Sequence, residues 1–385
     1  MGDKLTKRQI LQRFVRRDRK RTSSHTLWIC FVLLIFFTAG AIPQTAKEPP
    51  LVQRQDAVWT AVFGGDIVYD PNTVQATQRK GQPGLLASIR PWLKAADYST
   101  ANLGGPLAAS RTVKAGEADQ SGFDREIVRI LKDEGLKVVN LASDDVMAWG
   151  AEGLLDTFGA LTYHDIKFSG AGKDLEQSSI HPVQMYGRIR VATLGFNHIQ
   201  VGETAAGYQY PGVLPARAAV FSPLIRRARE QADLVIVHLH FGSGQTGRVH
   251  PDDEDLAKAM IDSGADIIIG HHPRRLKEVE VYNQGIIFYS LGVLAGGQGV
   301  SHQKETTVVS YSLMPCGTGV VRMIPLFSQG GTSHLPDGVL AAYRRWQIQN
   351  ALTRRLDQWH IDYLGSVVFT VDHSHVLQGV SAHEL

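Results

Sequence analysis

The sequence AKAMIDSGADIIIGHHP, at Ala257–Pro273, places the end of a helix, a buried strand and two histidines in immediate succession. Its first part completes a helical pattern over Asp253–Ser263, which stops at Gly264. The short apolar run Asp266–Gly270 has the pattern of a strand that is buried on both faces. The histidine pair follows that strand directly. This order predicts an α/β sheet with chemically active polar residues at the ends of its strands.

The same alternation of strand and helix patterns extends over most of the chain. Continuous apolar runs predict buried strands at Val58–Phe63, Leu136–Ala142, Arg190–Gly195, Leu234–His240, Asp266–Gly270 and Gly285–Leu291. Helical patterns lie between them at Leu85–Ala96, Phe123–Glu134, Ala151–Tyr163, Phe221–Gln231 and Asp253–Ser263. A Gly- and Ser-rich patch at Ser328–Ser333 predicts a break, followed by a helix-like and a strand-like segment. The chain is therefore predicted to be an α/β protein.

Polar residues follow five of the predicted strands. They are Asp66, Ser143-Asp144-Asp145, Asn197-His198, His238 with His240, and His271-His272. Carboxylates and imidazoles together are the ligands of Zn²⁺, Mn²⁺ or Fe, and two such ions can activate water and hold a phosphoryl group. The alternative is that these residues only mark where strands meet solvent. Five ends together favour a metal site that is functional or ancestral.

The N-terminal region has the pattern of a membrane anchor. Residues 1–25 hold nine Lys and Arg against two Asp, and the apolar segment 26–43 follows. Such a segment is about long enough to cross a bilayer, and the basic residues hold their side in the cytoplasm. We expect one transmembrane helix, a polar tether at 44–55 and an extracytoplasmic domain. The alternative is a signal peptide cleaved at Ala39-Gly40-Ala41; both readings export the domain.

The composition of the remaining chain is that of an ordinary globular domain. The 385 residues contain 40 Lys and Arg and 37 Asp and Glu, so 31 basic and 35 acidic residues lie beyond residue 25. This slight acidic excess gives no indication of nucleic-acid binding. Cys30 and Cys316 are too far apart in the predicted topology to pair readily, so we expect no disulfide.

Several motifs, in order, resemble a known family. They are GGDIVYD at Gly64–Asp70, ADYSTANLGGP at Ala96–Pro106, GLLDTFGAL at Gly153–Leu161, PGVLPA at Pro211–Ala216, ADLVIVHLHFG at Ala232–Gly242, the opening sequence, EVYNQGIIFYSLG at Glu280–Gly292 and TVDHS at Thr370–Ser374. The chain resembles the CapA/PgsA family of membrane-anchored capsule proteins of bacterial poly-γ-glutamate synthesis. The resemblance implies a calcineurin-like metallophosphoesterase-type sandwich of β-sheets flanked by helices over 56–328. Residues 329–385 would form a C-terminal helical and strand extension that packs on it.

The chain departs from the family pattern at the expected metal site. Gly104 replaces a Glu, Asp145 a His, Ala148 an Asp, Arg274 a His, Gly244 a Glu and Val293 an Asn. An Arg cannot ligate a metal, because its guanidinium stays protonated. The candidate metal ligands that remain are Asp66, Asp144, Asp145, His240, His271 and His272. The resemblance therefore implies a degraded site, with a divalent metal that is weakly bound or absent.

Three classes of function are consistent with these residues. The first is a non-catalytic or weakly active membrane subunit of poly-γ-glutamate synthesis and export, in contact with the other synthetase subunits and with the anionic polymer. The second is an exported metal-dependent hydrolase of a phosphoester or of the γ-glutamyl polymer. The third is a surface binding or adhesion module. Arg274, Arg275 and Lys277 are candidate polymer-binding residues, although the start of a solvated helix explains them equally well.

Overall fold

The structure is a computed structural model that describes residues 26–28, 30–31, 56–68, 70–78, 84–108, 123–124, 126–199, 201–242, 246–296 and 301–378. The chain divides into two units, residues 1–46 with 337–342 and residues 47–336 with 343–385. Residues 26–28 and 30–31 are helical, and the rest of the predicted tail, anchor and tether up to residue 55 lies outside the described residues. Among the described residues, no helix is long and apolar enough to span a membrane.

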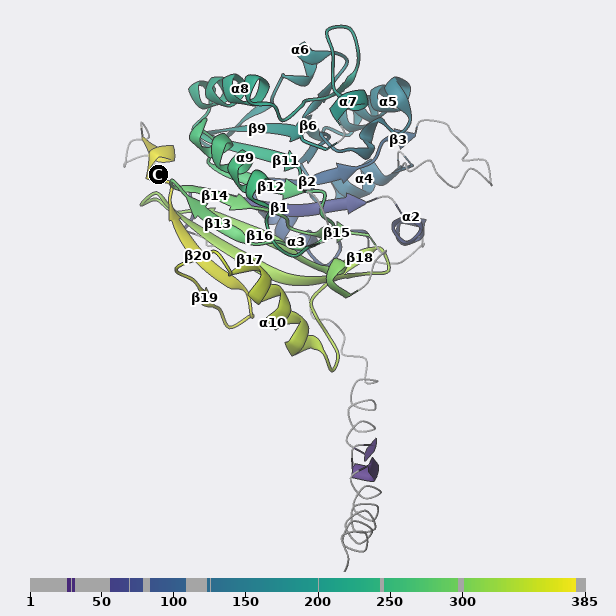
Figure 1. The fold of residues 1–385 in the computed structure, drawn as a ribbon, viewed down its shortest axis with the longest axis vertical. Helices are drawn as coiled ribbons and strands as arrows, with labels where there is room; N and C mark the ends of the chain where they lie inside the picture. Colours follow the sequence, from purple (N-terminus) through teal and green to yellow (C-terminus); the bar gives the residue numbers. More distant parts are fainter. Residues whose placement is uncertain are drawn as a thin grey trace, which may run out of the picture. The chain divides into compact units, whose positions relative to one another are not determined.

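The second unit contains a large sheet of ten strands (Figure 1). The order is β19 (His360–Ile361), β20 (Val367–Asp372), β17 (Thr318–Gln329), β16 (Glu305–Leu313), β1 (Trp59–Val68), β2 (Tyr98–Gly104), β5 (Val138–Asn140) and β6 (Lys167–Ser169). β15 (Val293–Ala295) pairs with β1, and β18 (Thr332–His334) pairs with β17. The half from β1 to β6 is parallel, and the half from β16 to β19 is antiparallel.

A second sheet of six strands carries the opening sequence. Its order is β13 (Val279–Tyr282), β14 (Gly285–Phe288), β12 (Ile267–His271), β11 (Leu234–His240), β9 (Ile189–Asn197) and β8 (Val183–Tyr186). The four central strands are parallel and the two edge strands antiparallel. Two smaller ladders join β3 (Leu107–Ala108) to β4 (Phe123–Asp124) and β7 (Ala171–Gly172) to β10 (Gly212–Val213).

The two sheets face each other across a common hydrophobic core. Trp59, Phe63 and Tyr98 of the large sheet pack with Ile269 and Phe288 of the small sheet in one buried cluster. Each such side chain contributes roughly 1.5–3 kcal/mol when it is fully buried. Successive residues of a strand point to opposite faces of the sheet. The outer faces of both sheets also carry apolar side chains, which are buried under helices.

Helices cover both outer faces. The large sheet carries α3 (Arg90–Ala95), α4 (Glu126–Asp133) and α5 (Gly150–Tyr163), and the small sheet carries α8 (Ala218–Gln231) and α9 (Pro251–Asp262). The other helices are α2 (Pro71–Gln78), α6 (Leu175–Ser178), α7 (Val201–Thr204) and α10 (Ala341–Leu352). Single 3₁₀ turns lie at Asp145–Met147, Ser301–Gln303 and Ser374–Leu377. The predicted α/β class is confirmed as a mixed α/β fold.

The sequence Ala257–Pro273 forms the predicted helix and strand. Pro251 is the first residue of α9, and the side chain of His250 accepts a hydrogen bond from the backbone NH of Asp252. Gly264 ends the helix with φ of 115°, a conformation that a glycine adopts without strain. β12 then runs from Ile267 to His271, one residue later than predicted.

Two strands of the predicted C-terminal extension belong to the large sheet. β20 pairs with β17 along six residues, and β19 pairs with β20. The division of the chain after residue 328 stays a prediction. Neither Cys30 nor Cys316 is in a disulfide among the described residues.

Candidate functional site

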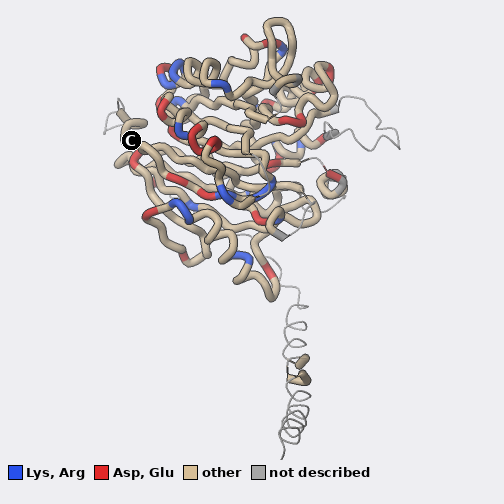
Figure 2. The backbone as a smooth tube through the Cα atoms, in the orientation of Figure 1, with Lys and Arg blue, Asp and Glu red and all other residues tan. Residues whose placement is uncertain are grey.

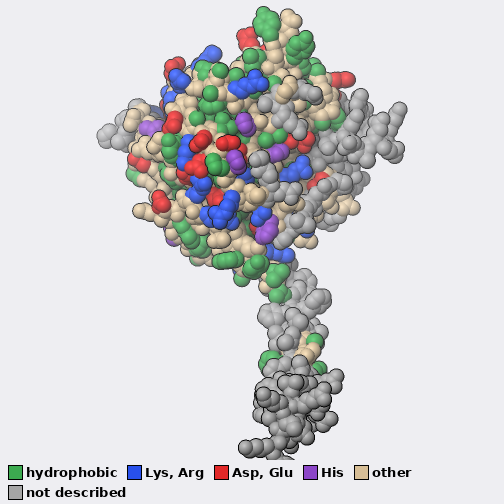
Figure 3. Space-filling model, in the orientation of Figure 1, with side chains coloured by type: hydrophobic (Ala, Val, Ile, Leu, Met, Phe, Trp, Pro, Cys, Tyr) green, Lys and Arg blue, Asp and Glu red, His purple; other side chains and the backbone are tan. Residues whose placement is uncertain are grey.

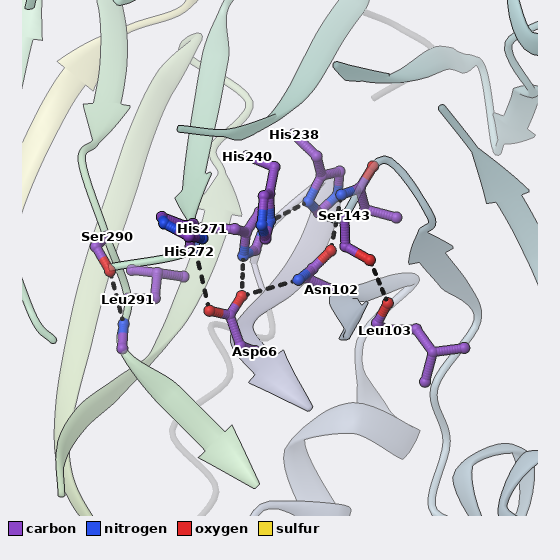
Figure 4. A network of polar contacts seen from close by, with 12 residues as sticks. Asp66, Asn102, Leu103, Ser143, His238, His240, His271, His272, Ser290 and Leu291 are labelled. Carbon is purple, nitrogen blue, oxygen red and sulfur yellow. Dashed lines mark hydrogen bonds and ion pairs between the residues drawn. The ribbon is translucent and has the colours of Figure 1, made fainter. Parts of the chain in front are cut away.

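The strands β1, β11 and β12 end at one rim and deliver their polar residues to it (Figure 4). The pairing of β1 with β2 shifts register between Phe63 and Asp66. This irregularity needs Gly65, because a Cβ atom there would lie 2.0 Å from the backbone oxygen of Gly292. Asp66 is buried at this bend and points toward His271 of β12.

A continuous chain of buried hydrogen bonds runs through Asp66. Oδ1 of Asp66 lies 2.8 Å from Nδ1 of His271, and Nε2 of His271 lies 2.8 Å from Nδ1 of His238. Nε2 of His238 lies 2.9 Å from Oγ1 of Thr100. The carboxylate only accepts, so His271 donates from Nδ1, accepts at Nε2 from His238, and His238 accepts from Thr100. Both ring nitrogens of each histidine are thereby used.

Further donors complete the surroundings of Asp66. Nδ2 of Asn102 donates to Oδ1 of Asp66 at 3.0 Å, and the backbone NH of His272 donates to Oδ2 at 3.2 Å. Asn102 in turn accepts from Nδ2 of Asn140 at 2.8 Å. Each oxygen of Asp66 thus has a protein donor. In this arrangement the polar atoms of the Asp66 and His271 side chains all have hydrogen-bond partners within the protein.

The electrostatics agree with an ionised Asp66 beside neutral histidines. Burial alone would raise the pKa of Asp66, but hydrogen bonding from His271, the nearby His240 and the NH of His272 together lower it. Burial lowers the pKa of His271, and the Asp66 carboxylate only partly offsets this. Burial also lowers the pKa of His238 well below its usual value. The hydrogen-bonded group of Asp66, His271 and His238 therefore carries one negative charge in a low-dielectric environment.

Asp144, His240 and His272 form a second group beside this chain. One ligand atom of each lies within 4.8 Å of the others, which makes them a candidate metal cluster. Nε2 of His240 lies 2.8 Å from Oδ1 of Asp144, and Nδ1 of His272 lies 3.4 Å from Oδ2. Burial would raise the pKa of Asp144, but hydrogen bonds from both histidines outweigh it and hold the pKa well below its usual range.

Three observations fit a cation at this cluster. Nδ1 of His240 is buried and has no hydrogen-bond partner among the described residues, so its lone pair remains available. One carboxylate and two imidazoles are a common ligand set of transition metals. His272 also has a φ of 95°, a strained conformation for a residue with a side chain, and such strain is frequent at functional sites.

Asp145 and Arg274 lie outside this cluster and pair with each other. Nη2 of Arg274 lies 3.6 Å from Oδ2 of Asp145. Both residues stand where the CapA/PgsA pattern has histidines, so two departures from that pattern meet in space. Burial and the charge of Asp144 raise the pKa of Asp145, and Arg274 partly offsets this.

Two further departures surround Asp66. Val293 of β15 is the residue opposite Asp66, and Gly104 lies at the end of β2 opposite Val68. Gly244 is outside the described residues. Four of the substituted positions, Gly104, Asp145, Arg274 and Val293, therefore lie at or next to the same rim, where they remove a Glu, an Asn and two histidines.

The predicted polymer-binding residues do not form one surface. Arg274 is half exposed, whereas Lys277 is buried and its Nζ lies 3.7 Å from Oδ2 of Asp253. Burial lowers the pKa of Lys277. Lys277 therefore faces Asp253 of α9, while Arg274 is exposed and Arg275 is partly exposed. The role of these residues in polymer binding stays a prediction.

Four residues of the hydrogen-bonded chain were not among the predicted ligands: Thr100, Asn102, Asn140 and His238. A signal for His238 is present in the sequence, because residues two apart on a strand share a face and His238 lies two before His240. Asn102 and Asn140 lie opposite each other on β2 and β5, and the sequence does not show that these two strands are neighbours.

These observations define the class of the protein. It is a mixed α/β protein with two facing sheets and a rim of Asp and His side chains. The family of bacterial capsule synthesis proteins PGA_cap matches residues 60–298. The chain belongs to this family.

The relatives match over nearly the whole length. The PGA biosynthesis protein CapA of Bacillus subtilis is 30% identical over 390 residues, covering 98% of this chain and all of the relative. The capsule biosynthesis protein CapA of Bacillus anthracis is 32% identical over 362 residues, covering 92% of this chain and 87% of the relative. Among solved structures, the NAD nucleotidase NadN of Haemophilus influenzae is 11% identical over 76% of this chain and 56% of that chain, with a TM-score of 0.40. A similarity of this size says nothing about activity.

Proposed function

We propose that the chain is a membrane-anchored subunit of a poly-γ-glutamate synthesis and export machinery. The observation that carries this proposal is the match to CapA proteins of two species over almost the full chain. The replacement of family ligands at Gly104, Asp145, Arg274 and Val293 supports a subunit that is non-catalytic or weakly active. A two-metal hydrolase needs a full set of ligands, and these positions lack the Glu, the two histidines and the Asn of the family pattern.

The candidate metal cluster at the rim supports a single divalent ion, for which Zn²⁺, Mn²⁺ and Fe are the candidates. Asp144, His240 and His272 would hold it, and such an ion would supply Lewis acidity toward a carboxylate or phosphoryl oxygen. Asp144 stays ionised because its pKa is lowered, so it brings one negative charge to the cluster. This arrangement is a degraded form of a metallophosphoesterase-type site, and we assign the fold to that type as part of the proposal.

The proposed location rests on the N-terminal sequence. The basic residues before position 26 would stay in the cytoplasm, and residues 26–43 would cross the membrane once. The described helical residues Leu27, Trp28 and Phe31 expose 71%, 71% and 58% of their surface, which an apolar surrounding would cover. The second unit would then lie outside the cytoplasm.

The proposed partners are the other membrane subunits of the synthetase and the emerging polymer. The anchor can pack against transmembrane helices, where close packing decides association. Figure 2 shows Lys and Arg interspersed with Asp and Glu along the described backbone. Arg274 and Arg275 lie near the rim and could meet glutamate carboxylates, although Arg274 is partly neutralised by Asp145.

Deletion of the chain tests this proposal directly. We expect cell-associated γ-linked glutamate to fall strongly in a producing strain, and the full chain to restore it. Complementation with His240→Ala should restore most of the polymer if the site is not catalytic. An unchanged amount of cell-associated γ-linked glutamate in the deletion strain would contradict the proposal and favour a surface binding or adhesion role. Full restoration by a secreted form without residues 1–43 would show that no membrane subunit is needed.

The second candidate is an exported metal-dependent hydrolase of a phosphoester or of the γ-glutamyl polymer. It is favoured by the three-residue cluster and by the strained backbone of His272. Polymer chain length separates the two functions. A hydrolase predicts longer polymer in a strain carrying His240→Ala, whereas a non-catalytic subunit predicts an unchanged length.

A further inference from the structure

A group of exposed aromatic and apolar side chains lies on α10 and around β19, in a part of the sequence that contributes no residue to the rim. Tyr343 and Trp346 of α10 expose 54% and 57% of their surface, and Trp359, Ile361 and Tyr363 expose 43%, 41% and 83%. We call these five residues the aromatic surface. Figure 3 shows hydrophobic side chains on the molecular surface in the region of α10. Large exposed apolar patches on a protein surface usually mark a contact site.

The two parts of the aromatic surface are held next to each other. The rings of Tyr343 and Trp346 stack with centroids 6.0 Å apart. Nε2 of Gln349, on α10, donates to the backbone oxygen of Gly365 at 2.8 Å, and Asp362 is held by Arg322 at 2.8 Å. The turn after β19 is therefore fixed against α10.

The charge of α10 selects the kind of partner. The helix has two basic residues, Arg344 and Arg345, and no acidic residue. Arg344 lies over the ring of Phe327 at 4.1 Å. Trp and Tyr rings with adjacent Arg side chains are the combination that settles at the headgroup level of a bilayer, with attraction to anionic lipid.

The tether length lets this surface reach a membrane. Residues 44–55 span at most about 40 Å when they are fully extended. β1 begins at Trp59, directly after the tether, and β19 is four strands away in the sheet order. Four strand spacings of about 4.8 Å amount to about 19 Å. An anchored domain can therefore rest its β19 edge and α10 on the lipid.

We propose that the aromatic surface docks on the anionic headgroup region of the membrane that holds the anchor, and so fixes the orientation of the domain. This proposal rests on the proposed function, because it takes residues 26–43 as the anchor. A bilayer is favoured over the polymer as the occupant because the five residues offer four aromatic rings and one aliphatic side chain rather than a row of cations.

Lipid quenching of a fluorescent probe tests the docking. The full chain, carrying Cys30→Ser and Cys316→Ser, receives a single labelled cysteine by Tyr363→Cys and is reconstituted in vesicles of phosphatidylcholine and phosphatidylglycerol that contain nitroxide lipid. The matched control is Tyr163→Cys, because Tyr163 is 85% exposed and Tyr363 is 83% exposed. We expect several-fold stronger quenching at position 363. Removal of phosphatidylglycerol, or Arg345→Gln, should weaken it.

The outcomes separate this inference from the proposed function. A chain that does not float with the vesicles would overturn both the anchor and the docking. A chain that floats, with equal quenching at positions 363 and 163, would overturn the docking alone. Quenching that is unaffected by phosphatidylglycerol would overturn the anionic preference. A probe at position 363 that responds to added poly-γ-glutamate but not to nitroxide lipid would assign the surface to the polymer.

Discussion

Arg274 and Asp145 lie 3.6 Å apart, guanidinium to carboxylate, at the two positions where the CapA/PgsA pattern has histidines. The two side chains are 50% and 41% exposed, so the ion pair itself contributes little to stability, about 0–1 kcal/mol. Its effect is on the rim. A permanent positive charge now stands where the family pattern has a metal ligand, and a carboxylate partly neutralises it.

Restoring both histidines should therefore strengthen metal binding. The double variant Asp145→His with Arg274→His removes one guanidinium and one carboxylate, so the net charge is unchanged, and adds two imidazole ligands. We expect the affinity for Zn²⁺ or Mn²⁺ to rise roughly tenfold or more, which corresponds to about 1–2 kcal/mol. Calorimetric titration measures it. Asp145→Asn with Arg274→Gln, which removes the pair without adding ligands, is the matched control, and equal affinities in the two variants would refute the idea.

The unaltered chain should hold at most one divalent ion. Among the described residues, Asp144, His240 and His272 form a group with converging ligand atoms, and Asp145, Arg274 and Val293 replace ligands of the family pattern at the rest of the rim. Metal analysis of the purified chain should show that Asp144→Ala and His240→Ala remove bound metal, while Asp145→Asn retains it. Hydrolysis of generic phosphoesters should stay near background. Two ions per chain, both lost in Asp66→Asn, would mean that the rim is an intact binuclear site.

His271→Ala should destabilise the fold even when metal is absent. It removes one hydrogen bond from the buried Asp66, which keeps those from Asn102 and the NH of His272. It also leaves Nδ1 of the buried His238 unpaired, and an unpaired buried polar group costs about 1–3 kcal/mol. The urea midpoint of the full chain in detergent measures the loss. His198→Ala, at an exposed histidine after β9, should leave the midpoint unchanged. An unaltered midpoint in His271→Ala would show that His271 has no structural role.

The stability should fall in mild acid because of His373. Its Nε2 donates to the backbone oxygen of Gln284 at 2.9 Å, and its Nδ1 accepts from the hydroxyl of Tyr311 at 2.6 Å. Burial lowers the pKa of His373 to about 4. The unfolded chain binds this proton near pH 6.5, so stability is complete above that pH and declines as the pH falls toward 4, by at most about 3 kcal/mol.

Comparison of unfolding free energies at pH 7 and pH 4.5 checks the effect. His373→Gln removes the titrating group and should show a smaller decrease between the two pH values. His360→Gln, at an exposed histidine of β19, should behave like the unaltered chain. An identical decrease in His373→Gln would assign the acid sensitivity to other groups.

The orientation in the membrane can be read with a reporter fused after Asp70. We expect activity only in a reporter that works outside the cytoplasm, because the basic residues before position 26 stay inside. Neutralising the cluster Arg16–Arg21 should weaken this orientation. Cytoplasmic activity of the reporter would contradict the proposed location of the domain.

Much of the small sheet could be predicted from local patterns. The range Leu234–His240 is the same in the sequence analysis and in β11, and β12 is displaced by one residue. These strands are buried on both faces, so their apolar runs are continuous. The antiparallel strands β16 and β17 were not predicted. β16 includes the polar residues Glu305, Thr306 and Thr307, which are buried in the fold and hide the apolar pattern.

The sequence by itself determined that Asp and His residues follow parallel strands, because the ends of such strands share one edge of a sheet. It also determined the family, through the order of its motifs. Only the tertiary structure decided which of these side chains pair. Asp66 and His271 are 205 residues apart and lie on two different sheets. Whether such groups bond to each other or face a metal depends on distances of a few ångströms between the sheets, which the packing of the shared core sets.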